Sequence, residues 1–202
     1  MFKTKSFRFL SALLFFLTIS FTPLTSYAGD WVLEDQAHVM DEAREICAPG
    51  ILKQKDNGYL YVQVDNRFVT QILPLIQVDG KIVPPVHVTS KKGIGAHISV
   101  MYENERIDNE IWTITELGSE FSFQVIELRT VKIVKEGKAK KLWLLAVSCP
   151  ELSVLRESYG LKPLLKGHDF HITLGYQIPG SAKELNVEEM ELLLEECILD
   201  AA

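Results

Sequence analysis

Apolar and polar residues alternate along several stretches of the chain, as they do in β-strands with one buried face. The clearest alternation lies at 59–64. Further strand-like segments, rich in β-branched and aromatic residues, are expected at 94–102, 112–117, 121–134, 142–148 and 170–177. Apolar residues at helical spacing predict a helix at 187–199. The polar, helix-prone segment at 35–47, which Pro49-Gly50 ends, and the segment at 150–159 are also expected to be helices, while 68–76 fits either a helix or a strand. The pattern indicates an α+β protein.

Glycine and proline residues mark the turns between these segments and the ends of a helix. Gly137, surrounded by lysines, predicts a hairpin turn between two strands. Pro150 suits the first turn of a helix, where its missing N–H leaves no hydrogen bond unmade, and Gly160 suits the exit of the same helix. Because no linker or low-complexity tract interrupts residues 29–202, we expect them to form a single domain.

The first 28 residues have the pattern of a cleaved signal peptide. An apolar run at 10–21 follows a basic head formed by Lys3, Lys5 and Arg8. The small residues of Ser26-Tyr27-Ala28 precede Gly29, where a signal peptidase would cut. The apolar run is shorter than the roughly 20 residues that span a bilayer. We therefore expect an exported protein, periplasmic or secreted, without stable membrane association. An uncleaved anchor is the alternative.

Charge narrows the range of partners. The whole chain carries a formal net charge of −6, and removing the basic leader leaves 18 basic against 27 acidic residues, a net −9. Affinity for long nucleic acid comes largely from lysine and arginine on phosphates, so such a partner is not expected. A small phosphate ester in a locally basic cleft remains compatible with this charge. We expect the mature domain to be a monomer.

Three cysteines, an odd number, allow at most one internal disulfide: Cys47, Cys149 and Cys197. An exported compartment would permit Cys47 and Cys197 to pair, whereas buried free thiols that pack as small apolar residues are the favoured interpretation. The chain has no Cys-x-x-Cys, and no cysteine and histidine spacing typical of a zinc site. We expect neither a metal nor a cofactor.

A short pattern occurs twice, as His-Ile-Ser-Val-Met-Tyr at 97–102 and His-Ile-Thr-Leu-Gly-Tyr at 171–176. On a strand, residues i and i+2 point to the same face, so each copy presents an imidazole beside a hydroxyl. The imidazoles are those of His97 and His171, and the hydroxyls those of Ser99 and Thr173. Two such pairs facing one cleft would supply a general acid, a general base and two phosphate-binding hydroxyls.

The chain resembles the 2H phosphoesterase superfamily, which is defined by two His-x-Thr/Ser motifs. The resemblance covers roughly 58–178 and is carried best by 142–176, where Leu155-Arg156-Glu157 and Tyr159-Gly160-Leu161 precede the second motif. Ser99 stands where threonine is more common. The resemblance implies a bilobal fold, in which two pseudo-symmetric antiparallel β-sheet lobes with flanking helices surround a central cleft.

The resemblance also implies an activity: metal-independent hydrolysis of a nucleotide or short oligonucleotide phosphodiester, often a 2′,3′-cyclic phosphate. One of His97 and His171 would act as the base and the other as the acid, in either order, while Ser99 and Thr173 would bind phosphate oxygens. One rival is an exported module that binds a phosphorylated ligand in the same cleft without turnover. Another is a structural protein in which the motifs coincide by chance.

Other residues are weaker candidates for substrate contacts. Tyr102 and Tyr176 lie five residues after their histidines, a spacing that turns them to the opposite face of an unbulged strand and favours packing roles. Lys166 is the first choice among the loop lysines for a phosphate contact. His168 is interpreted as structural, and His87 has no recognisable companion in the sequence.

Overall fold

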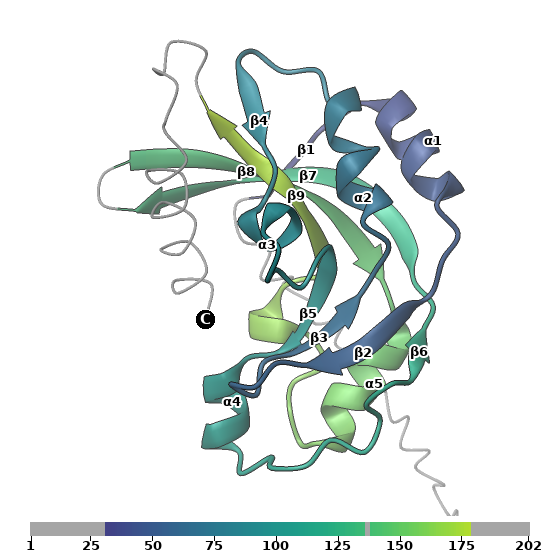
Figure 1. Cartoon of the computed structure of the whole chain (residues 1–202), viewed down its shortest axis with the longest axis vertical. Helices are drawn as coiled ribbons and strands as arrows, with labels where there is room; N and C mark the ends of the chain where they lie inside the picture. The colour runs from purple at the N-terminus through teal and green to yellow at the C-terminus, as the bar shows by residue number, and fades with distance from the viewer. Residues whose placement is uncertain (1–30, 136–137, 179–202) are drawn as a thin grey trace, which may run out of the picture.

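The computed structural model describes residues 31–135 and 138–178, which form one antiparallel sheet with short helices around it (Figure 1). The order of the sheet is β1-β7-β8-β9-β5-β3-β2-β6, and β4 pairs with β9. The strands are β1 (Trp31–Leu33), β2 (Gly50–Gln54), β3 (Leu60–Gln63), β4 (Lys81–Val83), β5 (His97–Met101), β6 (Glu120–Phe121), β7 (Gln124–Lys135), β8 (Lys138–Ser148) and β9 (His171–Ile178).

The helices are short, and two of them match clear sequence signals. They are α1 (Ala37–Glu45), α2 (Arg67–Thr70), α3 (Val86–Thr89), α4 (Glu103–Asp108) and α5 (Pro150–Ser158), with 3₁₀ turns η1 (Leu73–Leu75) and η2 (Leu165–Gly167). The predicted helix at 35–47 is α1, whose Val39 and Ala43 are fully buried. The helix predicted at 150–159 is α5, and it has its proline in the first turn. No helix among the described residues is long and apolar enough to cross a membrane.

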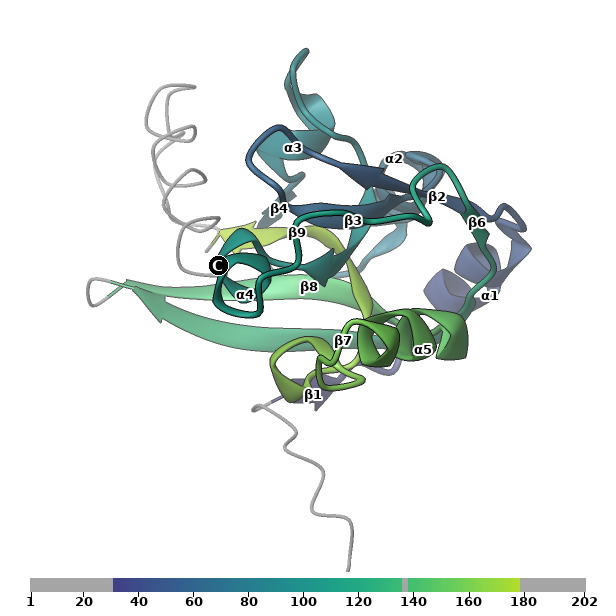
Figure 2. The ribbon, with the colours of Figure 1, turned by 90° about the horizontal axis from the view of Figure 1, so that it is seen from below.

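The two motifs lie on neighbouring strands, β5 and β9. Strand β9 pairs with β8 along one edge, while its other edge pairs with β5 near its start and with β4 near its end. A single residue pair, Ile98 with Ile172, joins β5 to β9. The expectation of two separate sheets is therefore corrected to one hydrogen-bonded sheet, joined at this narrow point (Figures 1 and 2).

Both motif strands carry a β-bulge at the same motif position. Val100 is the extra residue of β5 relative to β3, and Leu174 is the extra residue of β9 relative to β8. Each is the third residue after its histidine. A bulge shifts the alternation of faces by one residue. Side chains after the bulge therefore point to the face opposite to the one that they would occupy on a regular strand.

Gly175, next to the bulge in β9, allows β4 to approach closely. A Cβ at this position would lie 2.6 Å from the Val83 carbonyl oxygen and 2.7 Å from an Ile82 methyl carbon. Only glycine fits such an approach without moving the backbone. The glycine of the second motif therefore has a packing role in the sheet.

One cluster of buried side chains underlies both motif strands. Ile98 and Ile172 are fully buried, and they belong to the same cluster as Phe68 of α2, Trp143 of β8 and Leu152 of α5. The isoleucine between each histidine and its hydroxyl residue thus points into the core. This leaves the histidine and the hydroxyl on the opposite, half-buried face.

The prediction of a strand at 112–117 is wrong. This segment forms a loop and a turn, and Trp112 is 71% exposed. The carbonyls of Ile111 and Trp112 accept hydrogen bonds from the buried Arg106 guanidinium, at 3.2 Å each. A side chain thus takes the place of a partner strand for these backbone groups. The ambiguous segment 68–76 contains α2 and η1.

Several predictions lie wholly or partly outside the described residues. These are the leader at 1–28, the hairpin turn at Gly137, the helix at 187–199 and the state of Cys197. Of the two cysteines inside the described part, Cys149 is a buried free thiol, as expected, whereas Cys47 is exposed.

Candidate active site

The four motif residues share one face of the sheet where β5 and β9 meet. Antiparallel pairing of Ile98 with Ile172 sets a register in which His97 lies across from Thr173, and Ser99 across from His171. All four side chains are half-buried, while the residues between them are in the core. The structure thus brings together the two imidazoles and the two hydroxyls that the sequence selected.

Each imidazole is held in the same way. Nδ1 of His97 lies 2.9 Å from the Gly95 carbonyl oxygen, and Nδ1 of His171 lies 3.0 Å from the Asp169 carbonyl oxygen, in both cases two residues earlier. A carbonyl can only accept, so Nδ1 carries the proton in both rings. Each neutral ring therefore has its lone pair on Nε2, the atom left for acid and base chemistry.

Three stacked tyrosines line the first motif. The Tyr59 ring stacks between Tyr61 and Tyr102, with centroids 5.6 and 5.9 Å away, and its hydroxyl lies 2.5 Å from Ser99 Oγ. Tyr102 follows the bulge at Val100, and it joins Ser99 on the site face. The expectation that its odd spacing turns Tyr102 away therefore does not hold.

The bulge in β9 acts on Tyr176 in the same way. Thr173 pairs with Leu144 and Tyr176 with Leu142, two alternate residues of β8, so both motif residues lie on one face of β9. Tyr176 also pairs with Val83 of β4. The structure places it on the face predicted for the site, at the end of β9 away from His171.

A tryptophan from the N-terminal strand packs on the second motif. The Trp31 ring lies 5.8 Å, centroid to centroid, from both His168 and His171. Strand β1 brings it there by pairing with β7. Arg129 of β7 holds the loop before His171 through a 2.7 Å ion pair with the Asp169 carboxylate. Sequence reasoning missed Trp31, because its position depends on pairing with a strand about 100 residues away.

His87, which the sequence left without a companion, contacts His97. The two ring centroids are 4.5 Å apart at 66°. The intervening chain folds back through Gly93, where a Cβ would lie 2.2 Å from the His87 carbonyl oxygen, and the Gly95 N–H donates to that same oxygen at 2.7 Å. The two glycines just before the motif were the available signal, since they permit this tight return.

A small cavity of about 40 Å³ lies at the second motif. It is lined by Ser99, Tyr102, Leu165, Lys166, His168, Asp169, Phe170 and His171. Four predicted site residues are in this set, whereas His97, Thr173 and Tyr176 are not. Lys166 has a left-handed φ of 51°, a strained conformation for a residue other than glycine, and its Nζ lies 4.8 Å above the centre of the Tyr102 ring.

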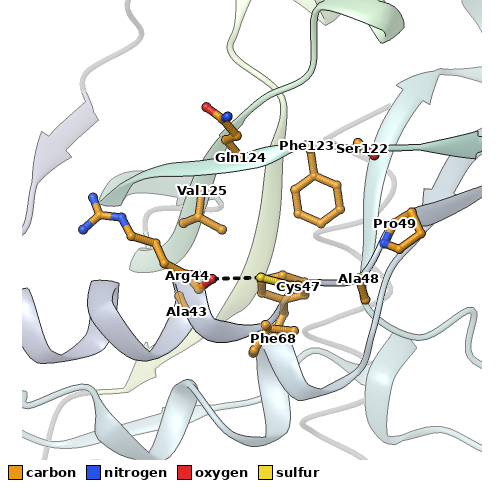
Figure 3. A pocket seen from close by; sticks show the side chains of 11 residues that line it. Ala43, Arg44, Cys47, Ala48, Pro49, Phe68, Ser122, Phe123, Gln124 and Val125 are labelled. Carbon is orange, nitrogen blue, oxygen red and sulfur yellow. Dashed lines mark hydrogen bonds between the residues drawn. The ribbon is translucent and has the colours of Figure 1, made fainter.

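A larger hollow lies elsewhere in the described part of the chain (Figure 3). It measures about 580 Å³, and its wall is mostly apolar, with Phe68, Phe123, Val125 and Pro49 among the lining residues. Cys47 also lines it, with its Sγ 3.6 Å from the Arg44 carbonyl oxygen. None of the predicted site residues lines this hollow. Cavity size alone therefore does not locate the motif chemistry.

Burial lowers the pKa of both motif histidines. Desolvation takes the pKa of His97 to about 4, against the opposing effect of its bond to the Gly95 carbonyl and with the help of the charges of His171 and Lys55. Desolvation likewise lowers the pKa of His171, and it lowers that of His87 to about 3. In the folded protein without ligand these imidazoles are neutral at pH 7.

These pKa shifts predict a loss of stability in mild acid. Below about pH 6.5 the unfolded chain binds protons at these histidines, while the folded protein does not until about pH 4 at His97. The free energy of unfolding should therefore fall as the pH drops from 6.5 to 4, by up to about 1.4 kcal/mol per pH unit for each histidine. Urea unfolding at pH 7, 6, 5 and 4 measures this, and His97→Gln should flatten the curve. Parallel curves for the two proteins would contradict the assignment.

Within the described residues, no group of three or more histidine, cysteine or acidic side chains is arranged to hold a metal ion.

Comparison with known proteins adds a family assignment to this geometry. No curated protein and no solved structure matches the chain. The model of the family described as "Swiss Army Knife, 2H phosphoesterase domain" matches residues 60–181 and spans both motifs. Because the match covers more than half of the 202 residues, the chain belongs to the 2H phosphoesterase family.

Proposed function

We propose that the protein is a metal-independent phosphodiesterase that opens a 2′,3′-cyclic phosphate on a nucleotide or short oligonucleotide. Its family is one of phosphoesterases, which supports hydrolysis of a phosphoester. One observation carries the finer proposal: two imidazoles, each with a hydroxyl beside it, lie on one face of the sheet where β5 meets β9. Nδ1–H of each imidazole donates to the backbone carbonyl two residues earlier. The two imidazoles supply both an acid and a base.

The reaction uses Nε2 of both rings. One neutral imidazole takes a proton from water as the water oxygen forms a bond to phosphorus. The other imidazole, which is protonated in the complex with the anionic substrate, donates its Nε2 proton to the ribose oxygen as the bond from that oxygen to phosphorus breaks. One water is consumed, a phosphomonoester is formed, and the histidines have exchanged protonation states. Because the rings are close enough to interact, they titrate as a coupled pair, and either can be the acid.

The two hydroxyls bind the non-bridging phosphate oxygens, where negative charge develops in the transition state. Ser99 Oγ already contacts the Tyr59 hydroxyl at 2.5 Å. With Tyr59 as donor, Ser99 keeps its own proton for a phosphate oxygen. Thr173 has the corresponding position in the second motif. Lys166, Tyr102 and Tyr176 are proposed substrate contacts at the edges of this site.

We also propose that the two motifs belong to pseudo-symmetric lobes. The paired bulges at Val100 and Leu174 support this, as do the paired bonds from Nδ1 to the carbonyl two residues earlier. Each of these features has the same place relative to its histidine. Repetition of backbone irregularities is harder to obtain by chance than repetition of residue types, because a bulge depends on the pairing of two strands.

Export remains part of the proposal. Cleavage before Gly29 would leave Trp31 and the rest of β1 in the mature protein, so the ring that packs on His171 would be kept. Expression of the full chain followed by N-terminal sequencing of the mature product tests this. A product that begins at Gly29 supports the proposal, and one that retains Met1 favours the anchored alternative.

Turnover with EDTA present tests the proposed activity. The panel contains 2′,3′-cyclic nucleotides and 2′–5′ and 3′–5′ dinucleotides, with products identified by chromatography. We expect hydrolysis of at least one cyclic nucleotide to a single phosphomonoester. Binding of these esters without any product would favour the non-catalytic binding module. Hydrolysis that EDTA abolishes would contradict a mechanism that depends on the two histidines alone.

A further inference from the structure

A buried nitrogen beside the site has no hydrogen-bond partner. Among the residues that the structure describes, Nδ1 of His168 is the buried side-chain nitrogen or oxygen atom without one. A buried polar atom left unpaired costs about 1–3 kcal/mol, so such atoms generally have a partner in water or in a ligand. This atom is therefore a sign of something that binds next to it.

The surrounding structure fixes the His168 ring at the wall of the small cavity. Its backbone N–H donates to the Leu165 carbonyl at 3.0 Å, and the Trp31 ring packs against it nearly edge to face at 76°. His168, His171 and Ser99 all line the cavity. The sequence interpretation of His168 as structural assumed a regular strand, whereas β9 begins only at His171.

The chemistry of the cavity favours an anionic oxygen. Its volume of about 40 Å³ exceeds what a single water needs. Lys166, which has a left-handed backbone conformation and lines the cavity, supplies a positive charge. The one carboxylate in the lining, that of Asp169, is paired with Arg129 at 2.7 Å. A histidine and a lysine that line the same cavity, with the acidic neighbour already paired, match a phosphoryl oxygen.

We propose that His168 is a third histidine of the substrate site, whose Nδ1–H donates a hydrogen bond to a phosphoryl oxygen beside His171. It binds substrate and transfers no proton. This inference rests on the proposed function, because it assigns His168 to the phosphate of the same ester. His168 thereby extends the recognition of phosphate beyond the two motif hydroxyls.

Two substitutions distinguish the role of the His168 nitrogen from the packing role of its ring. His168→Phe keeps a flat ring against Trp31 but removes the nitrogen. His168→Asn keeps an N–H donor near the position of Nδ1 and removes the rest of the ring. The dissociation constant for inorganic phosphate is measured by calorimetry for both variants and for the wild type, together with KM and kcat for a cyclic nucleotide.

We expect His168→Phe to weaken phosphate binding about 10-fold or more, as loss of a hydrogen bond to a charged group does, and to raise KM. His168→Asn should retain most of the phosphate affinity. Unfolding curves for each variant confirm that it folds. If His168→Phe binds phosphate as tightly as the wild type, the nitrogen has a structural water as its partner, and the inference is wrong. Absence of phosphate binding by the wild type at millimolar concentration also overturns it.

The two proposals can fail separately. Phosphate binding that depends on His168, in a protein that hydrolyses none of the esters, would sustain the phosphate site and reject the phosphodiesterase activity. If the protein hydrolyses a cyclic nucleotide and His168→Phe leaves KM and phosphate affinity unchanged, the phosphodiesterase activity is sustained and the role of His168 is rejected.

Discussion

The His97→Gln and His171→Gln variants should each hydrolyse a 2′,3′-cyclic nucleotide about 100- to 10,000-fold more slowly than the wild type. The reason is that glutamine can neither accept the water proton nor deliver a proton to the leaving oxygen. Both side chains lie on the same face of the β5–β9 contact, and both rings are held by an Nδ1–H bond to a backbone carbonyl. Steady-state kcat and kcat/KM for the three proteins give the measurement.

A matched control is His38→Gln. His38 is an exposed residue of α1, where its Nε2 bonds the Leu75 carbonyl at 3.0 Å, away from the motif strands. This variant should retain wild-type turnover. Equal losses in all three variants would point to an effect on folding, and near-normal turnover in either motif variant would contradict the two-histidine mechanism.

The double variant, with both histidines changed to glutamine, adds a further constraint. When two groups act together in one transition state, removing both lowers the rate by much less than the product of the two single decreases. We therefore expect the double variant to be only slightly slower than the slower single variant. A loss equal to the product of the two would indicate that the histidines act in separate steps.

The Arg156→Met variant should lower the free energy of unfolding by about 3–5 kcal/mol, because it leaves a carboxylate without its buried partner. Arg156 of α5 is fully buried, and its guanidinium donates to both oxygens of Glu105, at 2.8 and 2.6 Å. It also donates to the carbonyls of Val100, at 2.5 Å, and Lys162, at 2.8 Å. Methionine fills most of the same volume but satisfies none of these acceptors.

The bond to Val100 gives this arginine a second effect. Val100 is the bulged residue of β5, so Arg156 fixes the bulge that places Tyr102 on the site face. We expect Arg156→Met to reduce turnover as well as stability. Urea unfolding and kcat, measured on the same preparation below the unfolding transition, separate the two effects.

The control for this variant is Arg67→Met. Arg67 also pairs with a carboxylate, that of Asp65 at 2.8 Å, but its side chain is 54% exposed. Loss of such a surface pair costs about 0–1 kcal/mol. A similar small loss in Arg156→Met would show that the buried ion pair contributes little, and the proposed support of the bulge would then be wrong.

The family could be recognised from the sequence because its signal is local. The repeat of His-Ile-Ser/Thr-x-x-Tyr requires only residue types and the twofold alternation of a strand, and the family match includes both copies. Helices α1 and α5 were predictable for the same reason: helix-prone residues and the end signals Pro49-Gly50, Pro150 and Gly160 act within a few residues of one another. The segment at 112–117, predicted as a strand, is a loop and a turn. The Arg106 guanidinium binds the carbonyls of Ile111 and Trp112 there, a side-chain contact that the alternation of apolar and polar residues does not encode.

The sequence alone thus selected the residues that we propose carry the chemistry: His97, Ser99, His171 and Thr173. Tertiary structure decided how they meet and what surrounds them. The register of β5 on β9, the bulges that turn both tyrosines to the site face, and the approach of Trp31 and Arg156 all arise from pairing and packing between segments distant in the chain. Such contacts depend on the complementarity of whole surfaces, so short-range periodicity does not contain them.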